Sequence, residues 1–490
     1  MKQRLISAVL LMAALMTASC GGAGEETTPD VTETAAQTET EAETEDLRAP
    51  YAGMAPRIED FGGHNFRIFV HDGTKYDSDE ESGDTVNDAI YRRNKAVEDR
   101  YNITVSTVSG FGFDADRGLA LQSIQAGDDF ADVMGLFLIN SSIMLAQQGA
   151  LLAWNDYQDI RIDAPWWDER ITDIAVYDKQ YVLAGDIATC DDLRQMVITY
   201  NKALWSEMDY EDPYQMVLDG KWTVDKMYTL AKDISKDLDG DGKMTCADRF
   251  GILSEVKAAW YLFLGSGQKS ISYTDGAYLT NLSDEKSFDV MNRVVDVMSE
   301  MNNVCVIDDG KHNGELSTGE IWAEASKIFS EGRALFRTET FSGTEKLRNM
   351  GQDYGILPIP KWTEDQEEYY CMTNDDICAL SLPTTVKDPT RAALITEALA
   401  YESMFVLQPT FYEVYLSEKL LRDEQSRQMM DLVLSSKFYD MDFCFGGITG
   451  MPAAMQDMAR SKQNKVASKV ASLERSAQKK IDKFLKAFLE

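Results

Sequence analysis

Short apolar runs alternate with amphipathic stretches early in this chain, and this alternation restricts the fold more than any other feature. Runs typical of strands lie at 66–70, 103–105 and 131–137. A helical pattern over 86–101, with Asp84 as its N-cap, separates the first two, and a shorter one precedes the third. Strands that alternate with helices indicate parallel pairing, because parallel strands need a crossover connection. The sequence therefore predicts an α/β fold.

The rest of the chain is richer in helical patterns. Helices are predicted after Thr223 and over 288–301 and 325–332, and a strand closed by prolines is predicted at 354–360. The last pattern, 466–488, places its apolar residues on one stripe with lysines opposite. We expect this helix to pack on its own half of the molecule.

The length of the chain requires more than one hydrophobic core. About 430 of the 490 residues follow the two N-terminal segments described next, and a single core rarely grows that large. The composition supplies enough core residues, since 44% are hydrophobic. Two lobes are the expected organisation.

The first twenty residues read as a secretory signal. Lys2 and Arg4 precede an apolar run at 5–16, which is too short to span a bilayer, and the segment ends at Cys20. An ending on cysteine resembles the lipobox of bacterial lipoproteins, in which that cysteine is diacylated and becomes the new N-terminus. Thr17 departs from the leucine usual at its position. A plain cleaved signal peptide with a chance cysteine is the alternative.

Residues 21–60 are predicted to form a disordered acidic tether. Nine acidic residues and no basic one lie between 21 and 46, and like charges without apolar partners cannot offset the entropy of ordering. From Cys20 and this tether we expect a lipid-anchored protein on the extracellular face of the cell membrane.

Composition excludes several partners and site types. A net charge of −34 argues against nucleic acid, which needs a basic surface. Six cysteines follow Cys20 without any C-x-x-C pair, and buried free thiols are favoured over disulfides. The three histidines (His64, His71 and His312) lie far apart, which makes a His-based hydrolase or a zinc site improbable.

Residues 237–248, DLDGDGKMTCAD, match a calcium-binding loop. Ca²⁺ takes six to eight oxygen ligands, and alternate residues of such a loop point inward. The predicted ligands are Asp237, Asp239, Asp241, the Lys243 carbonyl and Asp248. No second helix is apparent after the loop, because 249–253 looks extended. We expect a structural Ca²⁺, and a solvated acidic turn is the alternative.

Six stretches follow one another in a characteristic order and spacing over most of the chain from about 62 to 405. They are 130–154, 179–207, 219–234, 329–343, 353–362 and 378–403. Together they resemble the extracellular solute-binding proteins of ABC importers, in the sugar-binding family that includes maltose-binding protein.

The resemblance implies a two-lobed periplasmic-binding-protein type II fold, with a hinge of crossing strands and extra C-terminal helices. Lobe one would comprise about 61–190 in part plus 355–405. Lobe two would comprise about 195–354 plus 406–490. One crossing would precede 200–202, and another would run over 355–360.

The resemblance also implies a ligand site in the interlobe cleft. A sugar requires aromatic faces against its C–H patches and polar groups for its hydroxyls. The predicted ligand-binding residues are Phe137, Asn140, Arg194, Trp260, Phe341, Asn374 and Asp375. Phe137 and Trp260 are about as well explained as core residues, and Trp166 and Trp167 are better explained by lobe packing than by ligand stacking.

The expected function is therefore delivery of a sugar or oligosaccharide to an ABC permease by a monomeric, membrane-anchored binding protein that is not an enzyme. A ligand-sensing lipoprotein for a membrane kinase has the same lobes and stays open. A surface glycosidase would need two carboxylates that flank a glycosidic bond, and 82 acidic residues always offer such pairs.

Overall fold

The computed structural model describes residues 47–71, 76–110, 113–312, 317–347, 350–374, 376–413, 421 and 423–489. The chain divides into two compact units, Met1–Ala55 and Pro56–Glu490. The predicted signal peptide with Cys20, and the acidic segment as far as residue 46, lie outside the described residues.

The predicted disordered tether, 21–60, is wrong in its last part. Residues Ala49–Met54 form a 3-10 helix, η1, with Pro50 in its first turn, where a missing N–H costs no hydrogen bond. In the second unit, Arg57 binds Asp159 through two hydrogen bonds of 2.8 and 3.1 Å. The folded body therefore begins near Pro56, before the predicted residue 61.

The first sheet has the strand order β2-β1-β3-β13-β4. The predicted parallel pairing is confirmed for its first three strands, which pair β2 to β1 and β1 to β3. β13 runs antiparallel to β3 and to β4. The strands are β1 (His64–Val70), β2 (Ile103–Ser109), β3 (Val133–Phe137), β4 (Leu151–Leu152) and β13 (Cys378–Pro383).

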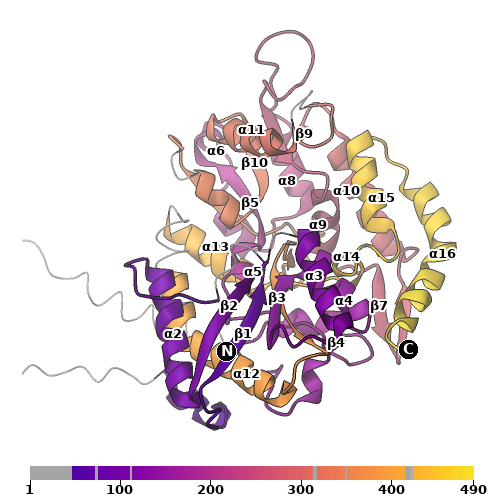
Figure 1. Cartoon of the computed structure of the whole chain (residues 1–490). Coiled ribbons are helices and arrows are strands. Elements are labelled where there is room, and N and C mark those ends of the chain that lie inside the picture. The colour runs from indigo at the N-terminus through magenta and orange to yellow at the C-terminus, as the bar shows by residue number, and fades with distance from the viewer. Residues whose placement is uncertain are drawn as a thin grey trace, which may run out of the picture. The chain divides into compact units, whose positions relative to one another are not determined.

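Four helices and one π-helical turn accompany the strands of the first sheet. Asp84 caps α2 as predicted, since its side chain accepts from the backbone N–H of Asn87. α2 packs along α12, as Figure 1 shows at the lower left. The helices are α2 (Thr85–Tyr101), α3 (Phe113–Ala126), α4 (Ile143–Gln147) and α12 (Pro389–Thr410), and the π-helical turn η2 (Leu138–Ser142) precedes α4.

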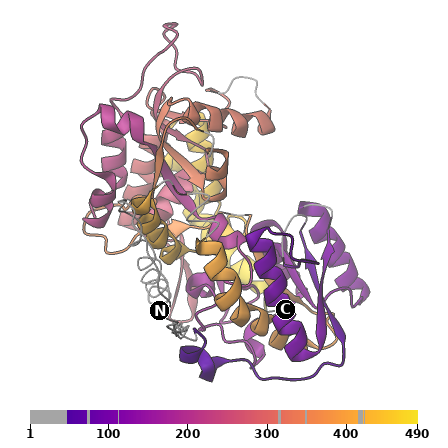
Figure 2. The same cartoon turned by 90° about the vertical axis from the view of Figure 1, so that its left-hand side faces the viewer.

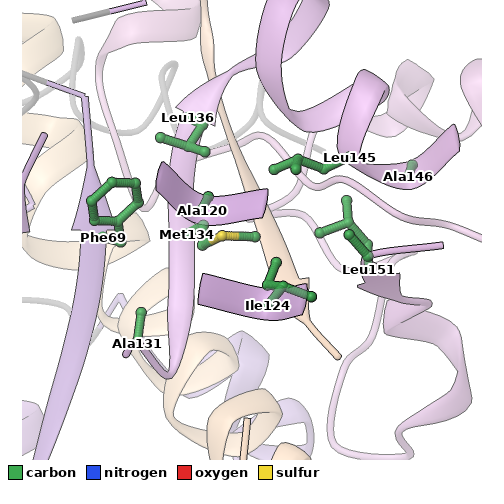
Figure 3. Close-up of a cluster of buried hydrophobic side chains, with 10 residues drawn as sticks. Phe69, Ala120, Ile124, Ala131, Met134, Leu136, Leu145, Ala146 and Leu151 are labelled. Carbon is green, nitrogen blue, oxygen red and sulfur yellow. The ribbon is translucent and has the colours of Figure 1, made fainter. Parts of the chain in front are cut away.

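A buried apolar cluster joins this sheet to α3 and α4 (Figure 3). Phe69 from β1, Met134 and Leu136 from β3, Ile124 from α3 and Leu145 from α4 meet there. Complete burial of one such side chain contributes roughly 1.5–3 kcal/mol. The apolar runs read from the sequence thus provide the core of this sheet.

The connection after β4 carries the two neighbouring tryptophans. Trp166 and Trp167 are 0% and 2% exposed, which supports their interpretation as packing residues. Gly185 pairs with Trp167, and a Cβ at Gly185 would lie 2.3 Å from the carbonyl oxygen of Trp166. The short helices here are η3 (Trp154–Asp156), η4 (Glu169–Ile174) and α5 (Cys190–Leu193).

The second sheet has the order β11-β5-β10-β6-β9. β6 pairs in parallel with β9 and β10, while β5 is antiparallel to β10 and β11. Figure 2 shows its magenta to salmon strands apart from the indigo strands of the first sheet. The strands are β5 (Met196–Asn201), β6 (Phe250–Ser254), β9 (Val304–Val306), β10 (Ala334–Thr340) and β11 (Tyr354–Leu357).

The elements around the second sheet include the predicted helices after Thr223, over 288–301 and over 325–332, with shifted ends. They are α6 (Lys202–Glu207), α7 (Pro213–Leu218), α8 (Val224–Ala231), α9 (Ala258–Gly265), α10 (Glu285–Ser299), α11 (Thr318–Ser330), η5 (Ser342–Leu347) and the hairpin β7 (Ile271–Thr274) and β8 (Ala277–Thr280).

The assignment of 355 onward to lobe one is wrong at its start. Tyr354–Leu357 pair with β5 in the second sheet, and the chain rejoins the first sheet only at Cys378. The strand itself was predicted from its apolar run, but its sheet depends on partners distant in sequence. The small β12 (Cys371–Met372) and β14 (Lys437–Phe438) pair in parallel nearby.

Four helices form the predicted C-terminal addition: α13 (Glu424–Ser435), α14 (Met441–Cys444), α15 (Met451–Ser461) and α16 (Val466–Lys486). In Figure 1 the yellow α15 and α16 lie beside α10. The stripe of α16 is buried as predicted, and α16 packs against α10, α15 and β8. Phe488, just beyond it, packs against the apolar cluster of the first sheet.

Within the described ranges, no helix has both the length and the apolar character needed to cross a membrane.

Candidate ligand site and calcium loop

The carboxyl edges of the parallel strands locate the candidate ligand site. In the first sheet, β3 ends at Phe137, opposite Cys378 at the start of β13. In the second sheet, β10 ends at Thr340, opposite Met196 at the start of β5. Ligands of open α/β sheets bind outside the carboxyl ends of the strands. The segments before Met196 and Cys378 therefore belong to this region.

Those two segments are in direct contact. Gln195 and Thr373 form an antiparallel bridge, and the Gln195 side-chain amide donates to the Thr373 hydroxyl at 2.6 Å. The backbone N–H of Asn374 donates to the carbonyl oxygen of Arg194 at 2.9 Å. The carboxyl edges of the two sheets meet where these segments pair.

Arg194 contacts residues from both edges. One guanidinium nitrogen lies 3.3 Å from Asp376 Oδ2, and the other donates to Ser342 Oγ at 3.2 Å. The Arg194 side chain is 37% exposed, so a ligand can reach it. Its planar set of donors suits oxygen-rich ligands.

Asn374 lies half-buried at the same place, and the Tyr261 hydroxyl donates to its side-chain oxygen at 3.0 Å. Tyr261 belongs to α9, which follows the carboxyl end of β6. The sequence prediction took its neighbour, Trp260, as the contact. Both aromatics are buried, and the rotation of α9 decides that Tyr261 is the one that reaches Asn374.

Trp260 and Phe341 are wrong as ligand contacts in this structure. Both side chains are fully buried, so neither presents a face to a ligand. The Trp260 indole N–H donates to the Asp440 carboxylate at 3.3 Å, and its ring lies 4.6 Å from that of Phe263. Both residues stabilise the core beneath the site.

Phe137 lies at the carboxyl end of β3 and keeps part of its surface. Its ring lies 4.1 Å from that of His71, which is hydrogen-bonded to Asp116. Asn140 falls in η2, but its side chain lies outside the described residues, as does the whole of Asp375. Of the predicted set, the structure joins Arg194 and Asn374 directly and adds Ser342 to the contacts of Arg194. Phe137 lies opposite Cys378 at the end of β3. Tyr261 is only 1% exposed, so it supports Asn374 from the core and offers no face to a ligand.

A buried carboxyl pair lies behind the site. Asp440 accepts from the Trp260 indole and from the backbone N–H of Phe443, and Asp442 accepts from Ser270 and Thr449. Burial, reinforced by the charge of Asp442, raises the pKa of Asp440 to about 7. Asp440 Oδ2 is buried and lacks a hydrogen-bond partner among the described residues. Asp440 is therefore a carboxyl group that prefers its proton.

A second buried cluster, which we call the Lys437 cluster, ties α5 to the C-terminal part of the chain. Lys437 Nζ lies 3.0 Å from Asp168, 2.6 Å from Asp191 and 2.6 Å from Asp192. The Tyr439 hydroxyl donates to Asp168 at 2.6 Å. One ammonium faces three carboxyl groups, and burial raises the pKa of Asp191 well above its usual range. Burial thus disfavours the charged form of Asp191, and the ammonium of Lys437 opposes this effect.

A hollow of about 430 Å³ lies at the opposite edge of the second sheet, around Tyr200, Lys202 and Tyr214. Its aromatic rings pack edge to face, and the Tyr214 hydroxyl is bonded to Asp423 and Ser426. It contains none of the predicted ligand residues, and it faces away from the carboxyl edge.

The predicted calcium loop has converging carboxylates. One oxygen each from Asp237, Asp239 and Asp248 lies within 4.8 Å of the others. Backbone N–H groups of Gly240 and Gly242 donate to Asp237, and these hydrogen bonds hold the pKa of Asp237 below its usual value. Oxygen ligands in a tight loop fit Ca²⁺.

The ends of the loop are fixed by the protein. Lys236 and Arg249 exchange backbone hydrogen bonds of 2.9 and 3.1 Å. Asp248 is fully buried and accepts from the backbone N–H groups of Leu238 and Thr245. β6 follows the loop directly, so the extended segment predicted at 249–253 is confirmed. Asp241 accepts from the Lys243 N–H at 2.7 Å.

Comparison with solved structures identifies the fold. The ABC substrate-binding protein Lmo0181 from Listeria monocytogenes, in complex with cycloalternan, is 12% identical with a TM-score of 0.55, over 86% of this chain and 99% of that chain. The chain has the two-lobed fold of solute-binding proteins. The expected fold class is confirmed.

Two further structures agree. A cyclo/maltodextrin-binding protein with maltotetraose is 15% identical with a TM-score of 0.55, over 87% of this chain and 98% of its own. Maltose-bound MalE3 of T. maritima is 10% identical with a TM-score of 0.52, over 85% of this chain and 99% of that chain. No family model matches the chain, and no curated protein matches it.

Proposed function

We propose that this protein is the substrate-binding protein of an ABC importer and binds a sugar or oligosaccharide. The observation that carries the proposal is the meeting of the two carboxyl edges at Arg194 and Asn374. In solved neighbours of the same fold the ligands are cycloalternan, maltotetraose and maltose. The first two of these neighbours are named as binding proteins, which favours a binding protein over an enzyme for this chain.

The chemistry at the edges suits a carbohydrate. Arg194 offers donors, while Asn374 and Asp376 offer acceptors, so adjacent hydroxyl groups find partners of both kinds. The exposed part of Phe137 offers an apolar face for a pyranose ring. Asn140 and Asp375 stay in the proposed ligand set on their sequence positions alone. Binding between lobes is coupled to their closure in proteins of this type.

Arg194 gives the sharpest test of this proposal. Arg194→Ala is expected to weaken oligosaccharide binding at least tenfold, because loss of a charged hydrogen-bonding group costs about 1.5–3 kcal/mol. Isothermal titration with maltotetraose and other oligosaccharides measures the affinity. Arg170→Ala is the matched control, since Arg170 has similar exposure but pairs with Glu368 away from the site.

A screen of the wild-type protein tests the substrate class directly. Thermal shifts with oligosaccharides support the proposal. Shifts with peptides or other solutes, and none with carbohydrates, contradict it. Equal affinity of wild type and Arg194→Ala for a carbohydrate would exclude Arg194 from the site.

We propose further that the loop at 237–248 binds a structural Ca²⁺ through Asp237, Asp239, Asp241, the Lys243 carbonyl and Asp248. Chelation is expected to lower the melting temperature, because a ligand at a hundred times its Kd stabilises the folded state by about 2.7 kcal/mol. Asp239→Ala is expected to melt equally with and without EGTA. Asp233→Ala, which replaces an exposed acidic residue just before the loop, is the control, and its melting temperature is still expected to fall in EGTA. An unchanged wild-type melting temperature in EGTA would disprove the site.

The proposed location is the extracellular face of the membrane, with Cys20 as the lipidated residue and permease subunits as partners. Cys20→Ser is expected to move the protein from the membrane fraction to the soluble fraction and to abolish labelling by a palmitate analogue. A single myristoyl chain binds only marginally, so diacylation is what makes such an anchor stable. Persistent membrane labelling of the Cys20→Ser variant would contradict the anchor, and Ser19→Ala is the matched control.

A further inference from the structure

Two cysteines face each other at the edge of the candidate ligand site. The backbone N–H of Cys378 donates to Cys190 Sγ at 3.3 Å, and Cys190 Sγ lies 3.6 Å from the carbonyl oxygen of Cys378. The sulfur of Cys190 therefore sits against the main chain of Cys378. The two thiol groups are also hydrogen-bonded to each other, which raises the pKa of Cys190.

These cysteines belong to the two segments that already pair. Cys190 opens α5, four residues before Arg194, and Cys378 opens β13, two residues after Asp376. The Gln195–Thr373 bridge and the Arg194–Asp376 ion pair join the same segments. The chain distance between the two cysteines is 188 residues, yet the local contacts hold them side by side.

We propose that Cys190 and Cys378 form a reversible disulfide bond, which pins the start of α5 to the start of β13. The proposal concerns thiol chemistry alone and does not depend on the ligand. An exported location would favour the bond, because disulfides persist in oxidising compartments.

The oxidant that the reaction needs is a disulfide, either of a small thiol or of another protein. The Cys190 thiolate attacks one sulfur of that disulfide, and the other sulfur leaves as a thiolate that takes up a proton. The Cys378 thiolate then attacks Cys190 Sγ and releases the second external thiol. Two protein thiols are oxidised, and one external disulfide is reduced to two thiols.

The order of these steps follows from access. Cys190 keeps part of its surface, whereas Cys378 is 4% exposed. Since the raised pKa of Cys190 keeps the thiolate scarce near neutral pH, oxidation is expected to speed up as the pH rises from 7 to 9.

Treatment of the full chain with oxidised glutathione, followed by peptide mapping without reduction, tests the proposal. The expected result is a linked peptide pair that contains Cys190 and Cys378, a mass loss of about 2 Da per bond, and reversal by dithiothreitol. The oxidised protein is expected to melt several degrees higher, because the bond closes a long loop of the unfolded chain.

Variants separate this pair from the other thiols. Cys190→Ser and Cys378→Ser are each expected to lack the linked peptide, whereas Cys371→Ser, at a buried cysteine elsewhere, keeps it. The peptide map of the wild-type protein tests the proposal even if one of these variants fails to fold. Oxidation that leaves Cys190 and Cys378 unlinked while glutathione modifies exposed thiols overturns the proposal. Loss of carbohydrate binding would leave it intact, so the two proposals fail independently.

Discussion

Replacement of Lys437 by methionine is expected to destabilise the folded protein by about 3–5 kcal/mol, the range for removal of one partner of a buried ion pair. The Lys437 side chain is 9% exposed, and it is the ammonium group that faces Asp168, Asp191 and Asp192 in the Lys437 cluster. Without it, the remaining carboxylates repel one another in a poorly solvated place. Urea unfolding at pH 7 measures the loss.

Two controls sharpen this prediction. Lys95→Met removes an exposed ion pair with Glu98 and is expected to cost less than about 1 kcal/mol. Asp191→Asn is expected to cost less than Lys437→Met, because burial already disfavours the charge of Asp191 and two carboxyl groups remain to pair with the ammonium. A loss for Lys437→Met no larger than that for Lys95→Met would show that the cluster is not a buried charge centre.

Stability is expected to fall as the pH rises from about 4 to 8, with Asp440 as a main cause. Its pKa in the folded protein is about 7, against about 3.9 for an unperturbed aspartate. The folded state therefore holds a proton that the unfolded chain has already released, so the stability that this group contributes is lost as the pH passes from 4 through 7. The difference corresponds to on the order of 4 kcal/mol.

Asp440→Asn tests this dependence, since the amide oxygen can still accept from Trp260 and from Phe443. The variant is expected to lose less stability between pH 5 and pH 8 than the wild type does, in urea unfolding at each pH. Glu397, whose pKa burial raises to about 7, acts in the same direction. The free energy of unfolding of the Asp440→Asn/Glu397→Gln double variant is therefore expected to depend on pH even less than that of Asp440→Asn. Parallel curves for wild type and Asp440→Asn would refute the assignment.

Local patterns predicted the elements well where periodicity and capping act over a few residues. The parallel strands of the first sheet, the Asp84 cap of α2 and the buried stripe of α16 followed from residue spacing. Residue spacing does not predict which sheet a strand joins. The pattern of Tyr354–Leu357 indicates a strand in either sheet. Its pairing with β5 is decided by contacts across more than 150 residues.

The candidate site shows the same limit. Arg194 and Asn374 were predicted through segments typical of the fold, and the structure joins their backbones by a hydrogen bond, while their contact with a ligand stays a prediction. Trp260 and Tyr261 are adjacent aromatics, so only the rotation of α9 decides that the tyrosine reaches Asn374. The Lys437 cluster could not be predicted, because its four members come from three distant segments and no local motif marks them.

The position of β13 also sets the order in which the chain can fold. β13 lies between β3 and β4, yet it is formed by Cys378–Pro383, whereas its two neighbours are complete by Leu152. More than three quarters of the 490 residues must be synthesised before the first sheet can close. Contacts between such distant segments slow folding, because the entropy of closing a long loop is lost first. The first sheet of a nascent chain would therefore stay incomplete until late in synthesis, and the proposed export would benefit from this delay, because translocation requires a chain that has not yet closed its core.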